Sequence, residues 1–295
     1  MPAHVFRPVR PRPRREARVR FAIAALSVLA VVFALFNITS CLSPGQVAPQ
    51  GASVVEGEGA KALSSLPRNQ YRWTNLERSE GRLSYTVDGQ VLSRMGVDVS
   101  SNQGAVDWNA VANDGIEFAY IRLGYRGTAT GTMMIDEDFE ANLQGAQAAG
   151  LDCGVYYFSQ AISVEEAHEE AQAVIDQLKG RPLQLPVVFD SETNAAGTGT
   201  SRTADLDNER MSDIALAFCE RIAAAGYQPM VYGNASDLQR YDLFRIMRYP
   251  LWWAEYDAAV PTTILDFKVW QYTSKGSVKG IPGSVDLNIE MSRVG

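Results

Sequence analysis

The sequence predicts an α/β fold, a TIM-like barrel of eight strands whose first five units carry helices and whose last three largely lack them. From Met95 onward, short apolar runs alternate with amphipathic helical patterns, which is typical of a parallel sheet with right-handed crossovers. Beyond Tyr241 the connections become too short for amphipathic helices. Acidic residues accompany several strand ends, as on the rim of a barrel where strand ends converge.

The N-terminal 42 residues predict a membrane segment behind a basic leader. Residues 1–20 contain seven arginines and one glutamate, and residues 21–42 are uncharged and largely apolar. As a helix this stretch would extend about 33 Å, enough to cross a membrane. The flanking arginines favour a cytoplasmic N-terminus, so we expect the rest of the chain outside the cell membrane. An internal core helix fits poorly with the Arg/Pro-rich leader.

This segment has two interpretations. No small-x-small cleavage site ends it convincingly, which favours an uncleaved signal anchor. However, Ile38-Thr39-Ser40-Cys41 resembles a bacterial lipobox, in which Cys41 would be lipidated and become the new N-terminus. Both interpretations tether the protein to the outer face of the membrane.

Two further segments precede the main domain, which we place at residues 95–295. Residues 43–69 are rich in Gly, Ala, Ser and Pro and predict a flexible linker. Residues 70–94 contain two strand-like runs around Asp88-Gly89, which indicates a β-hairpin. About 25 residues cannot hold a core alone, so we expect this hairpin extension to pack on the main domain.

The strands and helices of the main domain follow from periodicity and caps. Ser163 and Glu166 form a capping box at one helix start, and Gly150 and Gly226 end two helices. The expected helices are 136–149, 163–178 and 208–225. The expected strands are 96–100, 118–123, 153–158, 185–189, 230–233, 251–254, 268–272 and 285–289.

Asp190 and Glu192 directly follow the apolar run 185–189. Residues i and i+2 of a strand point to the same face, about 6.6–6.8 Å apart. Carboxylates that close in a partly dry site push their pKa values apart, so one stays protonated while the other is ionised. Such a pair suits general-acid cleavage of a glycosidic bond. The alternative is a strand end whose acids only solubilise a loop.

Two more acids lie in short apolar segments, Asp98 in 96–100 and Asp286 in 284–288. Acids on several separate strands are typical of a barrel active site, because the carboxyl ends of its strands share one rim. The predicted catalytic set is therefore Asp98, Asp190, Glu192 and Asp286.

Charge and residue usage argue against several other functions. Outside residues 1–42 the net charge is −13, which argues against a nucleic-acid partner. Only His4 and His168 occur, which argues against a Ser-His-Asp triad and a His-ligated zinc site. Gly197-Thr198-Gly199 lacks the glycine and lysine of a phosphate-binding loop. We expect a monomer without cofactor or metal.

Cys153 and Cys219 lie in apolar strand and helix contexts. We expect buried free thiols, although an exported location permits a disulfide.

Several motifs together resemble glycoside hydrolase family 25, the lysozyme family of N-acetylmuramidases, over about residues 95–292. The resemblance implies a (β/α)5(β)3 barrel, which agrees with the loss of helices inferred above. It also implies cleavage, with net retention, of the β-1,4 bond between N-acetylmuramic acid and N-acetylglucosamine in the glycan strands of peptidoglycan. The motifs are Gly96-Val97-Asp98-Val99-Ser100, Pro186 to Glu192, Leu251-Trp252-Trp253-Ala254, Trp270-Gln271-Tyr272 and Asp286-Leu287-Asn288.

The resemblance also implies roles for the acids. Glu192 would donate the proton to the leaving oxygen, and Asp190 would orient the 2-acetamido group or stabilise the oxocarbenium centre. Asp98 and Asp286 would tune the pKa of Glu192 and bind sugar. Whether a carboxylate attacks directly or the acetamido group does so stays open. Candidates for the sugar-binding wall are Tyr157, Trp253 and Gln271, with core packing as the alternative.

Two other functions share features with this sequence. A chitinase-like hydrolase of N-acetylglucosamine polymers would also use a DxE pair, but the positions before Asp190 are apolar rather than acidic. A catalytically silent, membrane-tethered scaffold that binds the cell wall would need no buried acidic cluster, because the repulsion within such a cluster costs stability.

Overall fold

The computed structural model describes residues 65–193 and 201–291, all within the compact unit Gly57–Gly295. The predicted leader, the membrane segment at 21–42 with Cys41, most of the linker and Gly197-Thr198-Gly199 lie outside the described residues. Within the described ranges, no helix has both the length and the apolar character that a membrane crossing requires.

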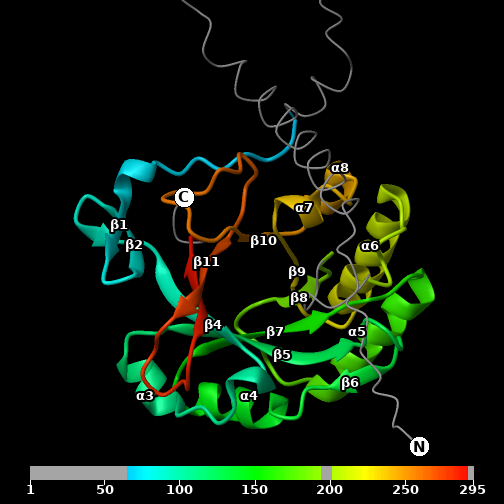
Figure 1. Cartoon of the computed structure of the whole chain (residues 1–295), viewed down its shortest axis with the longest axis horizontal. Coiled ribbons are helices and arrows are strands. Elements are labelled where there is room, and N and C mark those ends of the chain that lie inside the picture. The colour runs from blue at the N-terminus through cyan, green and yellow to red at the C-terminus, as the bar shows by residue number, and fades with distance from the viewer. Residues whose placement is uncertain (1–64, 194–200, 292–295) are drawn as a thin grey trace, which may run out of the picture. The chain divides into compact units, whose positions relative to one another are not determined.

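Eight strands close into a barrel, and pairing of the first with the second in sequence completes the circle (Figure 1). The prediction of an eight-stranded α/β barrel is confirmed. A short additional strand, β6 (Met133–Ile135), pairs antiparallel with the end of β5. The barrel strands are, in order around it, β4 (Arg94–Val99), β12 (Val285–Glu290), β11 (Val269–Gly276), β10 (Leu251–Ala254), β9 (Pro229–Gly233), β8 (Val187–Asp190), β7 (Asp152–Phe158) and β5 (Phe118–Arg126).

The last strand departs from the expected parallel sheet. Seven barrel strands run parallel to one another: β4, β5, β7, β8, β9, β10 and β11. The eighth, β12, is antiparallel to both of its neighbours, β11 and β4. The connection 277–284 is too short for the crossover of a dozen or more residues that a parallel return requires. Strand β12 therefore starts at the rim where the parallel strands end.

Helices follow the first five barrel strands, as expected, and are absent after β10 and β11. Ser163 caps α5 by accepting a hydrogen bond from the backbone N–H of Glu166, and Asp207 caps α6 in the same way through Arg210. The helices are α3 (Trp108–Asn113), α4 (Phe139–Ala148), α5 (Val164–Leu178), α6 (Asn208–Ala224), α7 (Ala235–Leu238) and α8 (Leu243–Ile246).

The hairpin extension lies against strands that no helix covers. Its strands β1 (Leu76–Ser79), β2 (Arg82–Val87) and β3 (Gln90–Val91) form an antiparallel sheet after the 3-10 turn η1 (Trp73–Asn75). Figure 1 shows this sheet beside β4 and β11, and β2 contacts both β4 and β12. The extension therefore supplies the apolar cover that helices provide elsewhere on the barrel.

Aromatic contacts hold the extension in place. The hydroxyl of Tyr71 donates to the carbonyl oxygen of Phe267 at 2.6 Å, and Tyr85 is buried against Tyr71. The packed body begins before residue 70, because Leu66 is buried and the amide of Asn69 donates to two carbonyl oxygens of the loop before β11. The last residues of the predicted linker thus belong to the folded unit.

The barrel interior is a packed aromatic floor. Phe118, Tyr120, Tyr232 and Trp252 belong to one apolar cluster, separate from the larger cluster between strands and helices. Trp252 stacks on Tyr120 with ring centroids 4.5 Å apart. A Cβ at Gly96 would lie 2.2 Å from the Phe118 ring, so a residue without a side chain is required there. This floor supports the rim where the acids lie.

Candidate active site

The barrel brings the four predicted acids to one rim. Asp98 lies near the end of β4, and Asp286 stands opposite it at the start of the antiparallel strand β12. Asp190 ends β8, and Glu192 follows two residues later. The charge of Asp98 raises the pKa of each of the other three acids, as expected for carboxyl groups on one rim.

Asp98 is fixed by two amide side chains. Its Oδ2 accepts hydrogen bonds from Asn288 Nδ2 and Gln271 Nε2, each at 2.8 Å. Asn288 Oδ1 in turn accepts from Trp252 Nε1 at 2.8 Å. Burial raises the pKa of Asp98 to about 6 although the two amide hydrogen bonds lower it. The carboxyl group is thus held in one orientation.

Two tyrosines complete the network on the other side of Gln271. Gln271 Oε1 accepts hydrogen bonds from the hydroxyls of Tyr232 and Tyr256, each at 2.8 Å. Because these donors fix the amide's orientation, Gln271 must present its Nε2 group to Asp98. Gln271 is therefore buried and orients Asp98, one of the predicted catalytic acids.

The remaining three acids have raised pKa values for similar reasons. Burial, followed by the charges of Asp237 and Asp98, raises the pKa of Glu192 to about 7. Burial and the charges of Asp98 and Glu192 raise that of Asp286 to about 8. The pKa of Asp190 is well above its ordinary value because the residue is buried and lies near Glu192, and its Oδ1 has no hydrogen-bond partner among the described residues. Glu192 can therefore hold a transferable proton near neutral pH.

A fifth acid, Asp237 of α7, supports Glu192 and was not predicted. It is fully buried, and its Oδ1 accepts hydrogen bonds from the backbone N–H of Thr193 at 3.0 Å and from its hydroxyl at 3.1 Å. Its Oδ2 accepts from the backbone N–H of Asn234 at 3.2 Å. Asp237 thus clamps the residue after Glu192. The Asn-x-x-Asp spacing after a strand, a form of capping box, is the sequence signal that could have identified it.

A cavity of about 300 Å³ opens beside Glu192, between the segments that follow β9 and β10. Tyr232, Trp253 and Tyr256 contribute aromatic surface to it. Trp253 Nε1 donates to Glu255 Oε2 at 2.9 Å, which fixes the indole at the cavity. Of the predicted sugar-binding residues, Trp253 lines this cavity, although it is only 4% exposed and belongs to the apolar cluster between strands and helices.

Tyr157 lies away from this cavity. Its side chain is fully buried toward the helices, and its ring centroid is 6.5 Å from that of Phe218 in α6. The preceding residue, Tyr156, points into the barrel because neighbours on a strand face opposite sides. Tyr156 packs edge-on against Trp252, and burial and the charge of Asp98 raise its pKa. Sequence alone did not separate these two tyrosines.

Residues 65–193 and 201–291 contain no group of three or more His, Cys, Asp or Glu side chains arranged to hold a metal ion. Cys153 and Cys219 are both buried free thiols, as expected.

An acidic rim on an α/β barrel, with one carboxyl poised to give up a proton beside an aromatic cavity, defines a carboxylate-dependent glycoside hydrolase. Comparison with known families agrees: the model described as "Glycosyl hydrolases family 25" matches residues 97–281. The chain belongs to this family and is a glycoside hydrolase. The matched range includes Asp98, Asp190 and Glu192, whereas Asp286 and the hairpin extension lie outside it.

Similar proteins include lysozymes. The chain is 30% identical over 289 residues to Lysozyme M1 of Streptomyces globisporus, which covers 94% of this chain and 91% of that protein. It is 28% identical over 193 residues to the autolytic lysozyme of Clostridium acetobutylicum, covering 65% of this chain but only 54% of that protein, about half its length. The crystal structure of the bacterial lysozyme from Streptomyces coelicolor matches with a TM-score of 0.52 and 28% identity, over 66% of this chain and 90% of that one.

Proposed function

We propose that the protein is a peptidoglycan hydrolase, a 1,4-β-N-acetylmuramidase that cleaves between N-acetylmuramic acid and N-acetylglucosamine with net retention. The observation that carries the proposal is Glu192, whose pKa of about 7 in a cluster of acids suits a proton donor at neutral pH. The likeness to lysozymes, including one over 94% of this chain, supports the choice of substrate.

In the first step, the protonated carboxyl of Glu192 gives its proton to the glycosidic oxygen as the bond to the anomeric carbon breaks. The leaving sugar departs with a new hydroxyl, and positive charge develops on the sugar that stays. Asp190 lies on the same rim and has an oxygen without a hydrogen-bond partner among the described residues, so it can orient the 2-acetamido group or stabilise this charge. Asp98 and Asp286 complete the acidic floor.

The second step returns the proton. A carboxylate oxygen, or the acetamido oxygen of the substrate, first forms a bond to the anomeric carbon as the leaving sugar departs. Water then attacks the anomeric carbon from the opposite side and displaces that oxygen. Glu192, now ionised, removes a proton from that water. Two displacements restore the original configuration, which gives the retention that we propose.

Mass spectrometry of the fragments released from purified peptidoglycan by the full chain tests this proposal. Fragments that end in a reducing N-acetylmuramic acid support a muramidase. Fragments that end in a reducing N-acetylglucosamine would indicate a glucosaminidase instead. Cleavage of chitin oligomers with peptidoglycan left intact would favour the chitinase-like alternative. Binding to peptidoglycan without any fragment would favour the silent scaffold.

We also propose that the protein acts as a monomer tethered outside the cell membrane by residues 21–42. The supporting feature is the apolar stretch behind seven arginines. Membrane fractionation with Cys41→Ala separates the two forms of tether. An unchanged molecular mass and an unchanged membrane fraction support an uncleaved anchor, whereas release or loss of lipid mass supports a lipoprotein.

A further inference from the structure

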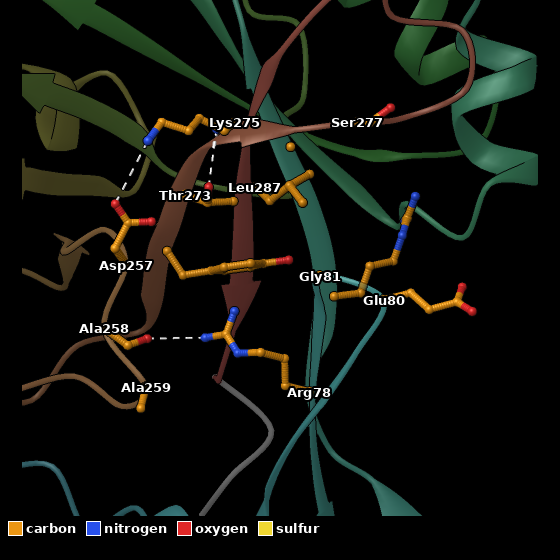
Figure 2. Close-up of a pocket in the computed structure, with 13 residues that line it drawn as sticks. Arg78, Glu80, Gly81, Asp257, Ala258, Ala259, Thr273, Lys275, Ser277 and Leu287 are labelled. Carbon is orange, nitrogen blue, oxygen red and sulfur yellow. Dashed lines mark hydrogen bonds and ion pairs between the residues drawn. The ribbon is translucent and has the colours of Figure 1, made fainter.

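A second cavity, of about 590 Å³, lies between the hairpin extension and the barrel. We call it the hairpin groove, and Figure 2 shows its lining. The extension contributes the turn between β1 and β2, and the barrel contributes residues 257–259 and the end of β11. The side chains used below are Arg78, Arg82, Asp257, Tyr272, Thr273 and Lys275. Because the extension precedes the range matched by the family, four of the 13 residues that line this groove, Arg78, Glu80, Gly81 and Arg82, come from a segment before that range.

Arg78 offers a positive group that no carboxylate neutralises among the described residues. Its guanidinium carbon lies 5.7 Å from the centroid of the buried Tyr272 ring, and one nitrogen donates to the carbonyl oxygen of Ala258 at 3.1 Å (Figure 2). These two contacts hold the planar group in place. A guanidinium has five N–H donors, so most of them remain for a ligand.

Lys275 supplies a second cation to the hairpin groove. Its Nζ lies 4.0 Å from Asp257 Oδ2, and both side chains are more than three-quarters exposed. An ion pair this long and this exposed contributes little, so a ligand carboxylate can compete with Asp257. Arg82 differs, because the carboxylate of Asp114 already pairs with it. Arg78 and Lys275 thus give the hairpin groove two cations that can bind a ligand, although residues 43–295 carry a net charge of −13.

The strands and loops that line the hairpin groove also contribute residues to the acidic rim. Leu287 follows Asp286, Thr273 lies two residues after Gln271, and Asp257 follows Tyr256, whose hydroxyl bonds Gln271. In peptidoglycan, N-acetylmuramic acid carries a peptide branch with free carboxylates. The same strands therefore carry both sites, and the peptide branch is the part of the glycan whose charge matches Arg78 and Lys275.

We propose that the hairpin groove binds the carboxylate-bearing peptide branch of the wall glycan through Arg78 and Lys275, with the hydroxyl of Thr273 as a further polar contact. This inference rests on the proposed function, since it assigns a second recognition site to the same substrate. Charge-assisted hydrogen bonds from a preoriented guanidinium are the strong contacts in such a site.

Calorimetric titration of the full chain carrying Glu192→Gln, so that ligands are not consumed, tests the proposal. The probes are the N-acetylglucosamine–N-acetylmuramic acid disaccharide with its tetrapeptide and the same disaccharide without it. We expect the peptide to tighten binding about tenfold, and Arg78→Ala with Lys275→Ala to abolish this gain. Arg221→Ala, which removes a cation from the outer face of α6, should preserve it. Equal affinity of all three proteins for the bare disaccharide shows that each is folded.

Equal affinity for the two probes, or a peptide gain that survives the double substitution, would overturn the proposal. If poly(glycerol phosphate) binds in an Arg78-dependent way while the peptide adds nothing, the groove recognises a phosphate polymer instead. The result is separate from the proposed function: if wild-type protein releases muramic-acid-ended fragments but the Glu192→Gln protein shows no peptide gain, only this inference is lost. If wild-type protein releases no such fragments but the Glu192→Gln protein shows the Arg78-dependent gain, only the proposed reaction is lost.

Discussion

Asp98 and Asp286 stand directly opposite each other in the antiparallel ladder of β4 and β12. Side chains at such positions share one face of the sheet, and like charges there destabilise a folded strand pair. The protein reduces the cost by binding protons, because the pKa values of the two carboxyls are raised to about 6 and about 8. The charge that remains at higher pH is the cost of assembling the site.

Asp286→Asn should therefore stabilise the protein in mildly alkaline solution. A carboxyl whose folded-state pKa is raised favours folding fully below its unfolded pKa, and this contribution is lost as pH rises through the folded value of about 8. We expect Tm to rise by about 2–4 °C at pH 9 and to change little at pH 4, by scanning calorimetry. Asp88→Asn, in the exposed β2–β3 turn, is the matched control. A Tm that falls at pH 9 would contradict this explanation.

Glu192→Gln should remove catalysis while the fold is retained. Gln has nearly the same shape but cannot donate a carboxyl proton, so kcat should fall by about 10²–10⁴-fold. Release of reducing ends from peptidoglycan measures the loss, and circular dichroism checks the fold. Glu140→Gln on the exposed face of α4 should keep wild-type kcat. Activity within a few-fold of wild type in Glu192→Gln would assign the proton to another residue.

Gln271→Glu tests the network that orients Asp98. The new carboxylate can still accept from Tyr232 and Tyr256, but it replaces the donor that bonds Asp98 with an acceptor. A lost hydrogen bond to a charged group is worth about 1.5–3 kcal/mol, so we expect kcat/KM to fall about 10–100-fold. Gln90→Glu on β3, which introduces the same charge far from the site, is the matched control. If both variants matched wild type, the network would have no role in catalysis.

Tyr85→Ala tests the role of the hairpin extension as a cover for the barrel. The ring is buried, and its hydroxyl accepts from the backbone N–H of Arg72 at 2.8 Å. Loss of a large buried aromatic side chain costs about 3–5 kcal/mol of unfolding free energy, which urea titration measures. Val91→Ala on the exposed strand β3 should cost less than about 0.5 kcal/mol. Equal stability of the two variants would show that the extension is only an appendage.

The sequence predicted the strands well, and it indicated that the four acids lie on one rim, because both features depend on local pattern. Apolar runs bounded by Gly and polar residues located all eight barrel strands, and carboxylates within or just after four of these segments located the rim. The direction of β12 was missed, although the short connection 277–284 carried the signal for an antiparallel return. Contacts between distant segments left no local trace: no spacing links Asp237 to Thr193. Tyr156 and Tyr157 are chemically alike, and only the register of β7 with β8 decides which one faces the acids.

The pH dependence of kcat/KM for wild type and Asp237→Asn tests most directly the claim that burial and the surrounding acids together keep Glu192 protonated. Glu192 is influenced by Asp237 of α7 and Asp98 of β4, with Asp190 and Asp286 on the same rim. The wild-type alkaline limb should have its midpoint near pH 7. Asp237→Asn can still accept from Thr193 but removes a negative charge, so the pKa of Glu192 should fall and the limb should move to lower pH. Wild-type activity that is already lost near pH 4.5, or a limb that Asp237→Asn leaves in place, would contradict the account.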